Sequence, residues 1–265
     1  MTYTGDFYKY CDSEAKHSAQ EIIPILLEFI EPKSIVDVGC GVATWLSVFQ
    51  QYEIEDILGI DSDFVDRQML LIPKSKFKSQ DISQPFSMDR KFDLVVCLEV
   101  AEHLPPENAE AFISSLCNLG DIVLFSAAIP HQGGTHHVNE QWTDYWKEAF
   151  DKRGYVFVDC IRPRVWNNEN VAFFYAQNMI LYVKANQTAN YLNLKQCLEP
   201  NFKSHFVSVV HPKQYLEAVK RMQPENMCLS SALTQCWKIL SVLPSLFYRA
   251  VNRRVLSKTN KIKLC

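Results

Sequence analysis

The sequence predicts a doubly wound α/β fold, in which helices cover both faces of a mainly parallel sheet. Three observations lead to this prediction. Apolar, β-branched runs of a few residues recur along the first 185 residues, as expected for strands that are buried on both faces. Stretches with helical spacing separate most of these runs. The 265 residues are enough for one sizeable α/β domain with an extension, and 48% of them are hydrophobic, as in ordinary folded proteins.

The expected strands and helices alternate along this part of the chain. The strand-like runs are Ser34–Val38, Ile54–Ile60, a shorter piece around Phe77, Phe92–Leu98, Ile122–Ala127, Tyr155–Ile161 and Met179–Val183. The helical stretches are Gln20–Ile30, Thr44–Gln51, Pro106–Leu119 and Asn139–Arg153. Alternation of this kind implies right-handed crossovers between parallel strands. Ligands of such sheets bind in the crevice beyond the carboxyl ends of the strands.

Charge divides the chain into two parts. The formal net charge is −3, but residues 1–185 contain 15 Lys and Arg against 27 Asp and Glu, whereas residues 186–265 contain 12 against 3. We therefore expect one domain over residues 1–185 and a basic, mainly helical C-terminal extension over residues 186–265. Helices are expected there at Pro212–Met222 and at Leu229–Arg254, the second broken at Pro244.

The basic extension has two candidate partners. It could pack on the acidic body of the same chain, or it could contact an anionic partner, either a membrane surface or nucleic acid. After Pro244, apolar side chains share one helical face and the arginines lie largely outside it. The segment Leu246–Leu264 is therefore a candidate for weak contact with an anionic membrane.

Cysteine usage and hydropathy indicate the cellular compartment. Nine cysteines are scattered without any Cys-x-x-Cys pair, so we expect reduced thiols and a cytoplasmic location. No apolar run approaches the roughly 18–20 residues that cross a bilayer. Residues 1–10 lack the basic and apolar regions of a signal peptide.

A glycine loop and two aspartates predict a nucleoside site. Two of the eight glycines lie in Val36-Asp-Val-Gly-Cys-Gly-Val-Ala43, which follows the first strand and opens a helix, so backbone N–H groups can approach a ligand there. Asp61 ends the second strand, where a carboxylate can accept both hydroxyls of a ribose. Asp81 follows the third strand-like piece and is placed for an adenine amino group. The alternatives are a tight turn without a ligand, a helix cap and a turn aspartate.

The same residues discriminate among nucleotides. Thr44 stands where a dinucleotide-binding loop has Gly or Ala, and the Gly-Lys-Ser/Thr of a phosphate-binding loop is absent. Asp37 would repel a pyrophosphate but would suit a cationic amino-acid group. A ligand with an amine, a ribose and an adenine but no phosphate fits these residues best, and S-adenosylmethionine (SAM) is such a ligand.

Four segments resemble the successive motifs of class I SAM-dependent methyltransferases: Val36–Thr44, Gly59–Asp61, Gln80–Ile82 and Phe92–Leu104. The resemblance covers residues 1–185. It implies a Rossmann-like, seven-stranded sheet whose last strand is antiparallel, formed by a hairpin through Tyr155–Ile161 and Met179–Val183. It also implies the residues that bind SAM, which are Asp37, Gly39, Cys40, Gly41, Asp61, Ser62, Asp81, Ile82, Leu98 and Glu99. Ala43 departs from the pattern, because many members have a third glycine there.

The later segment Ser126–Trp142 resembles a bacterial subgroup that is often linked to glycan and secondary-metabolite pathways. This resemblance favours a hydroxyl of a small molecule or saccharide as the methyl acceptor. An alcohol must lose its proton during transfer, which requires a base near neutral pH or a cation that lowers the pKa of the hydroxyl. Four of the seven histidines lie in the loops that follow the fourth and fifth expected strands, where such a group belongs.

Three interpretations of these loops stay open. In the first, His103 or His137 is the general base. In the second, a divalent cation (Mg²⁺, Mn²⁺ or Fe²⁺) is bound by Glu99, Glu102, His103 and His137. The Glu-x-x-Glu-His spacing with a later His is similar to that of metal-dependent 2′-O-methyltransferases of small RNAs. The Glu-x-x-Glu-His pattern is also similar to one in quinone-biosynthesis O-methyltransferases. In the third, Glu102 and His103 only cap and orient the following helix.

The predicted function is O-methylation of a small molecule or saccharide. The alternatives are a metal-dependent RNA 2′-O-methyltransferase and a SAM-binding regulator without chemistry. The strongly acidic body and the lack of an aromatic and basic stacking platform argue against nucleic acid as the partner.

Overall fold

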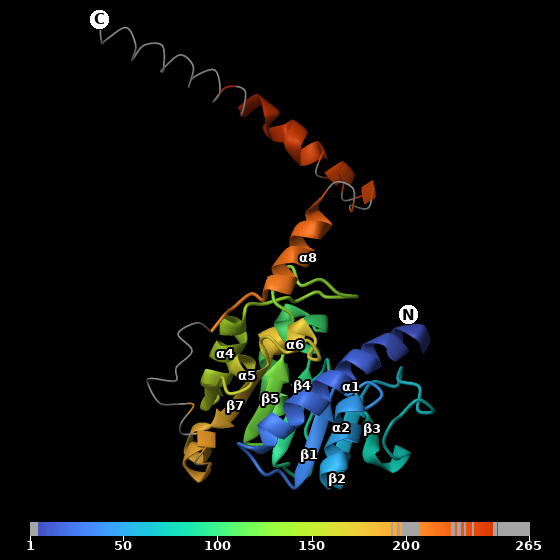
Figure 1. Cartoon of the computed structure of the whole chain (residues 1–265), viewed down its shortest axis with the longest axis vertical. Helices are drawn as coiled ribbons and strands as arrows, with labels where there is room; N and C mark the ends of the chain where they lie inside the picture. Colours follow the sequence, from blue (N-terminus) through green and yellow to red (C-terminus); the bar gives the residue numbers. More distant parts are fainter. Residues whose placement is uncertain are drawn as a thin grey trace, which may run out of the picture. The chain divides into compact units, whose positions relative to one another are not determined.

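A seven-stranded sheet forms the centre of the computed structural model, in the order β3-β2-β1-β4-β5-β7-β6 (Figure 1). The structure describes residues 5–191 (5–12 by backbone only), 193–194, 197, 207–223, 226, 229–230, 232–234, 236–245 and 248. The strands are β1 (Ser34–Val38), β2 (Asp56–Asp61), β3 (Phe77–Ser79), β4 (Leu94–Leu98), β5 (Ile122–Ser126), β6 (Tyr155–Val158) and β7 (Ile180–Lys184). Strands β1 to β5 pair in parallel, and β7 runs antiparallel between β5 and β6. The predicted sheet with an antiparallel last strand is confirmed.

Helices pack on both faces of the sheet, as the doubly wound prediction requires. The helices are α1 (Gly5–Leu27), α2 (Thr44–Phe49), α3 (Ala109–Leu119), α4 (Thr143–Asp151), α5 (Arg162–Val165), α6 (Phe173–Asn178) and α8 (Pro212–Met222). One apolar core joins the sheet to α1, α2, α5 and α6, and a second joins it to α3 and α4. Successive residues of β1 and β4 enter opposite cores, because side chains alternate along a strand.

Several elements differ from their predicted bounds. The expected helix Gln20–Ile30 is much longer at its start, since α1 begins at Gly5, and it ends at Leu27 because Phe29 and Ile30 both donate to the carbonyl of Leu26 in a closing turn. The last two strands pair antiparallel as expected, and the connection between them contains α5 and α6. This two-helix connection matters for function, because α6 contributes side chains to the candidate active site.

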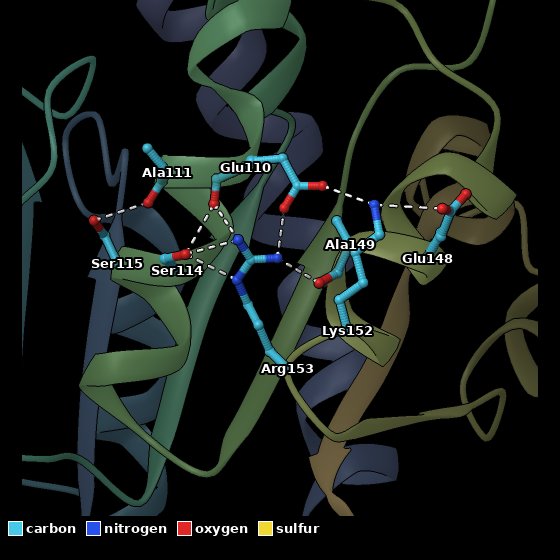
Figure 2. Close-up of polar contacts among 8 residues, drawn as sticks. All are labelled: Glu110, Ala111, Ser114, Ser115, Glu148, Ala149, Lys152 and Arg153. Atoms are coloured by element: carbon cyan, nitrogen blue, oxygen red, sulfur yellow. Dashed lines mark hydrogen bonds and ion pairs between the residues drawn. The ribbon is translucent and has the colours of Figure 1, made fainter.

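Arg153, which follows α4 in the chain, links α3 to α4 through hydrogen bonds and an ion pair (Figure 2). Its guanidinium donates to the hydroxyl of Ser114 (2.9 and 2.7 Å) and to the carbonyls of Glu110 (2.6 Å) and Ala149 (2.7 Å). It also pairs with the Glu110 carboxylate at 2.8 Å, which Lys152 approaches at 3.1 Å. Because this side chain is largely buried and fully hydrogen-bonded, it holds two helices together on the second face of the sheet.

The chain divides into two compact units, Met1–Gln214 and Tyr215–Cys265. Composition changes at residue 185, whereas the packing of the first unit continues to Gln214. Leu194, His211 and Gln214 are buried. Arg162 forms a buried ion pair with Asp159 (2.6 Å) and also donates a hydrogen bond to the carbonyl of Val207 (2.9 Å).

The basic extension is described only in part. The expected helix Pro212–Met222 is confirmed as α8. The segment Leu246–Leu264, predicted to contact a membrane, lies outside the described residues except for Tyr248. No helix among the described residues is both long and apolar enough to cross a bilayer.

Candidate active site

The predicted cofactor residues meet at the carboxyl edge of the parallel strands. Strand β1 lies between β2 and β4, so the chain reverses its direction of strand addition at this point. A crevice forms at such a switch point, and the loops after the neighbouring strands line it. Asp61 is the last residue of β2, and the loops after β1, β3 and β4 carry Gly39–Gly41, Asp81 and Glu99 respectively. The topology therefore gathers residues that are up to 60 positions apart in sequence.

The glycine loop is held against the end of β2. The N–H groups of Gly39 and Cys40 donate to the carbonyl of Ile60 (2.8 and 3.2 Å), and that of Gly41 donates to Asp61 Oδ2 (2.7 Å). Gly39 has a φ of 80°, and a Cβ there would lie 2.4 Å from Cγ2 of Val100. Only glycine fits this position, because both the backbone conformation and the close approach exclude a side chain.

Asp37 and Asp61 place two buried carboxyl groups beside this loop. Asp37 is 4% exposed, and burial together with the charge of Asp61 raises its pKa to about 8. Burial also raises the pKa of Asp61, although Oδ2 and Oδ1 accept from the N–H groups of Gly41 and Ser62, each at 2.7 Å. No cationic side chain among the described residues offsets either shift. The pair therefore favours a ligand that brings its own positive charge.

The other predicted cofactor residues surround this pair. The N–H of Gln80 donates to the carbonyl of Asp61 at 2.9 Å, which brings the loop of Asp81 to the end of β2. Asp81 accepts from the N–H and hydroxyl of Ser83, so its pKa is lowered. Leu98 is buried in the first apolar core, which Cys40 also contacts, and Ile82 packs against the second.

Glu99 belongs to a buried network of amides. Its carboxylate accepts from Gln132 Nε2 at 2.7 Å and from Asn178 Nδ2 at 3.2 Å, and burial raises its pKa. Asn178 also donates to Gln132 Oε1 at 2.9 Å, and Gln177 connects Asn178 to the N–H of His211. Glu99 has a φ of 54°, a strained conformation for a residue with a side chain, which this network holds in place.

The amides of this network were not found by sequence reasoning. Gln132, Gln177 and Asn178 come from the loop after β5 and from α6, which the predicted hairpin did not contain. The available signal was a pair of adjacent amides before an apolar strand and after an aromatic run. That signal is weak, because an amide carries no chemistry until its neighbours are known.

Glu140 organises the loop that follows β5. Its carboxylate accepts from the backbone N–H groups of His131 (2.8 Å) and Gly133 (2.7 Å), and it bonds Nδ1 of His137 at 3.0 Å. His131 and His136 have φ values of 69° and 62°, so this loop is bent into conformations that are uncommon for residues other than glycine. With Nδ1 donating to a carboxylate, the Nε2 atom of His137 keeps its lone pair.

Glu102, His103 and His137 form a cluster between the two loops. One ligand atom from each lies within 4.8 Å of the others. The rings of His103 and His137 meet edge to face at 4.8 Å, and burial lowers the pKa of His103. Glu102 is fully buried, and among the described residues its carboxylate oxygens have no side-chain hydrogen-bond partner, while the backbone N–H groups of Glu102 and Ala128 only partly offset the rise in its pKa. Burial and the charge of Glu99 raise the pKa of Glu102 well above its usual value.

The cluster brings together three of the four residues that were predicted to bind a metal. The fourth, Glu99, is committed to Gln132 and Asn178. An unpartnered buried carboxyl group beside two imidazoles has the donor chemistry of a transition-metal or Mn²⁺ site. It could equally be a neutral carboxylic acid that donates a hydrogen bond to a ligand.

Comparisons with known proteins concern the same part of the chain. The family model described as a methyltransferase domain matches residues 11–159. Among curated protein sequences, none matches this chain.

Solved structures resemble this chain over about two thirds of its length. Magnesium protoporphyrin IX methyltransferase from Synechocystis PCC 6803, with bound S-adenosylhomocysteine (SAH), has 20% identity and a TM-score of 0.46, with 67% of this chain and 87% of that chain covered. DesVI of Streptomyces venezuelae has 16% identity and a TM-score of 0.49, over 68% and 95% of the two chains. CalS10, an amino pentose methyltransferase from Micromonospora echinaspora, has 13% identity and a TM-score of 0.48, over 69% and 98%.

Proposed function

The chain belongs to the methyltransferase domain family, and from this premise we propose that it transfers a methyl group from SAM to a hydroxyl of a small molecule or saccharide. The observation that carries the hydroxyl assignment is the Glu140–His137 pair. An amine in its neutral form can attack the sulfonium methyl without a base, whereas a hydroxyl needs to lose its proton. A histidine with a fixed tautomer and a free Nε2 is suited to take that proton.

SAM is the cofactor in this proposal, and the crevice at the end of β1 supports it. Asp61 would accept the ribose hydroxyls, and the loop of Asp81 would approach the adenine. Asp37 would pair with the ammonium group of the methionine moiety, which supplies the positive charge that the two buried carboxyl groups lack. The loop of Gly39, Cys40 and Gly41 would let the ligand approach the backbone closely. Hydrogen bonds from its three N–H groups to the end of β2 hold the loop in place.

His137 is the proposed general base, and Glu140 is its positioning residue. The acceptor hydroxyl attacks the methyl carbon as the bond from that carbon to sulfur breaks, so SAH leaves as a neutral thioether. The proton of the hydroxyl passes to Nε2 of His137, and the Glu140 carboxylate stabilises the imidazolium that results. Glu140 also fixes the backbone at His131 and Gly133, so it holds the whole loop in the shape that presents the base.

A second candidate mechanism rests on the unpartnered carboxyl group of Glu102. In this mechanism Glu102, His103 and His137 hold a divalent cation, with Mn²⁺ or Fe²⁺ favoured over Mg²⁺ by the two imidazoles. The cation would lower the pKa of an acceptor hydroxyl. Glu140 would then orient His137 as a ligand rather than as a base.

The acceptor side of the site supports a ring-shaped substrate. The loop that follows β5, residues 127–142, is called the histidine loop. Trp142 ends this loop and Tyr145 lies at the start of α4, and their side chains are 44% and 37% exposed. Exposed aromatic faces next to a catalytic loop can stack on a sugar or an aromatic ring. Trp146 does not share this role, because it is buried in the second core.

The described cysteines are free thiols, which supports a location in the reducing cytoplasm. They are Cys40, Cys97, Cys117, Cys160, Cys197 and Cys236.

The test of this proposal uses SAM and a panel of sugars, nucleotide sugars, phenols and amines, with SAH formation as the readout. We expect turnover with at least one hydroxyl acceptor. His137→Gln should lower kcat by roughly 10²–10⁴-fold and leave the affinity for SAH unchanged. His17→Gln, which alters an exposed residue of α1, is the matched control and should retain full turnover. Methylation of amines alone, or full activity of His137→Gln, would contradict the proposal.

Chelation separates the two mechanisms. If His137 is the base, enzyme treated with a chelator keeps its turnover, and Glu140→Gln lowers kcat because the imidazolium loses the carboxylate that stabilises it. If the cluster binds a metal, the chelated enzyme is inactive and added Mn²⁺ restores it. Mn²⁺ binding measured by electron paramagnetic resonance provides a readout besides activity. Glu102→Gln should abolish that signal, whereas Glu107→Gln, an exposed residue of the next turn, should not.

A further inference from the structure

The second compact unit exposes an unusual amount of apolar surface. Its described residues 229–230, 232–234 and 236–245 are helical. Among them, every large hydrophobic side chain is more than two fifths exposed, and Leu229 and Trp237 reach 76% and 75%. Single exposed apolar residues need no explanation, but a contiguous set on one helix indicates a surface that binds something.

Most of the exposed apolar side chains lie on one side of the helix formed by residues 236–245. At about 100° per residue, Trp237, Ile239, Leu240 and Leu243 fall within roughly half of its circumference, and Val242 lies about 60° outside that half. The opposite side carries Lys238, Ser241 and Ser245. The hydroxyls of Ser241 and Ser245 donate to carbonyls of their own helix (2.7 and 2.8 Å), so this side makes few demands on a partner. We call the first set the apolar side and the second the polar side.

The charge of this region restricts what can cover the apolar side. Residues 226–265 contain seven cations and no acid, and the cations are Lys238, Arg249, Arg253, Arg254, Lys258, Lys261 and Lys263. An apolar helix side together with a run of uncompensated cations matches an interface of lipid tails below anionic headgroups. Trp237 and Tyr248, both exposed, are residue types that concentrate at the boundary between headgroups and hydrocarbon.

We propose that the apolar side of residues 236–245 inserts into the surface of an anionic phospholipid bilayer, with the helix lying in the plane of the membrane. A spanning orientation is disfavoured because Lys238 and Arg249 bound this apolar stretch at a separation well short of the roughly 20 apolar residues needed. A groove in a partner protein needs a narrower stripe, of positions such as i, i+4 and i+7, than the half circumference seen here. The proposal concerns the second unit alone and does not depend on which acceptor is methylated.

The test is co-sedimentation of the full-length protein with phosphatidylcholine vesicles, with and without phosphatidylglycerol. We expect binding to the vesicles that contain phosphatidylglycerol and weaker binding as salt is raised. Leu240→Asn and Trp237→Asn, on the apolar side, should each weaken the partition at least about tenfold, because a buried apolar side chain is lost. Ser241→Asn is the matched control on the polar side and should change the partition less than about twofold. None of these substitutions alters the first unit, and thermal unfolding checks that it stays folded.

Four results would overturn the proposal. The first is the absence of binding, and the second is equal binding to neutral and anionic vesicles. The third is an equal loss in Ser241→Asn and Leu240→Asn, which would mean that the apolar side has no special role. The fourth concerns protein that does not bind vesicles. In such protein, either a dimer that the substitution Trp237→Asn dissociates or a melting temperature that Leu240→Asn lowers would overturn the proposal. A second copy or the protein's own body would then cover the apolar side.

Discussion

The raised pKa of Asp37 should make cofactor affinity depend on pH. The perturbation is a change of pH from 6 to 7 during titration with SAH, whose ammonium group stays protonated in this range and, in the proposed pocket, requires an ionised Asp37. With a pKa of about 8, roughly a hundredth of the carboxyl groups are ionised at pH 6 and roughly a tenth at pH 7. Since apparent affinity scales with the competent fraction, it should rise about tenfold, or about 1.4 kcal/mol.

Calorimetry in buffers with different enthalpies of ionisation measures both the affinity and the accompanying proton release. Nearly one proton should leave the complex per SAH bound at both pH 6 and pH 7, because almost all of the Asp37 carboxyl groups start protonated. Asp37→Asn should bind more weakly and lose the pH dependence. Methylthioadenosine, which lacks the amino-acid group, should show no rise in affinity. An affinity for SAH that stays flat between pH 6 and 7, or that rises equally in Asp37→Asn, would refute the reasoning.

The same group affects stability with a definite sign. The folded-state pKa of Asp37 lies above the value of an unfolded aspartate, so the native state binds the extra proton. Its contribution is therefore complete below about pH 4 and is lost as pH rises through about 8.

Two further predictions concern the glycine loop and the contacts of Arg153 between α3 and α4. Gly39→Ala should weaken SAH binding by more than about 100-fold in calorimetry, because the φ of Gly39 is 80° and an added Cβ would lie 2.4 Å from Val100. Gly41→Ala should have a milder effect, because Gly41 has a φ of 53° and no atom lies within 4 Å of its added Cβ. Equal effects of the two substitutions would mean that backbone strain alone matters. Arg153→Met should lower the free energy of unfolding by about 2 kcal/mol in urea titrations, because its carbonyl and hydroxyl partners lose a charged donor. Arg67→Met, at an exposed position, is the control and should lower the free energy of unfolding by less than about 0.5 kcal/mol. A similar loss in both variants would show that Arg153 does not join α3 to α4.

The fold could be predicted because its signals are local and repeated. Buried parallel strands are short apolar runs, and six strands were recognised from these runs; β1 matches its expected bounds, and the bounds of the other five moved by at most three residues. β3 has only three residues, and its neighbours in sequence indicated it rather than its own composition. The start of α1 was missed because its first half lacks a clear apolar stripe. α5 and α6 were missed because each has six residues or fewer, too short for periodicity to register.

The site was predictable where chemistry depends on residue type and not where it depends on tertiary neighbours. Glycine and aspartate at strand ends carry their own signal, so the loop of Gly39 and Asp61 was found. Ala43 adopts a φ of 68°, a conformation that favours glycine, so its position in the loop was recognisable only through the resemblance. That Glu99 turns to Asn178 while Glu102 stays unpartnered follows from the placement of α6, which no local pattern encodes.

The amide chain that runs from Glu99 to His211 sets a lower limit on how this enzyme can be shortened or recombined. Gln177 accepts from the N–H of His211, and Gln214 donates to the carbonyl of His131, so residues from the far end of the first unit complete the polar wall behind the histidine loop. A fragment that stops where the sheet stops would retain every strand but leave buried amides without partners. A shortened or recombined chain must therefore keep residues 207–214 together with the loop that follows β5.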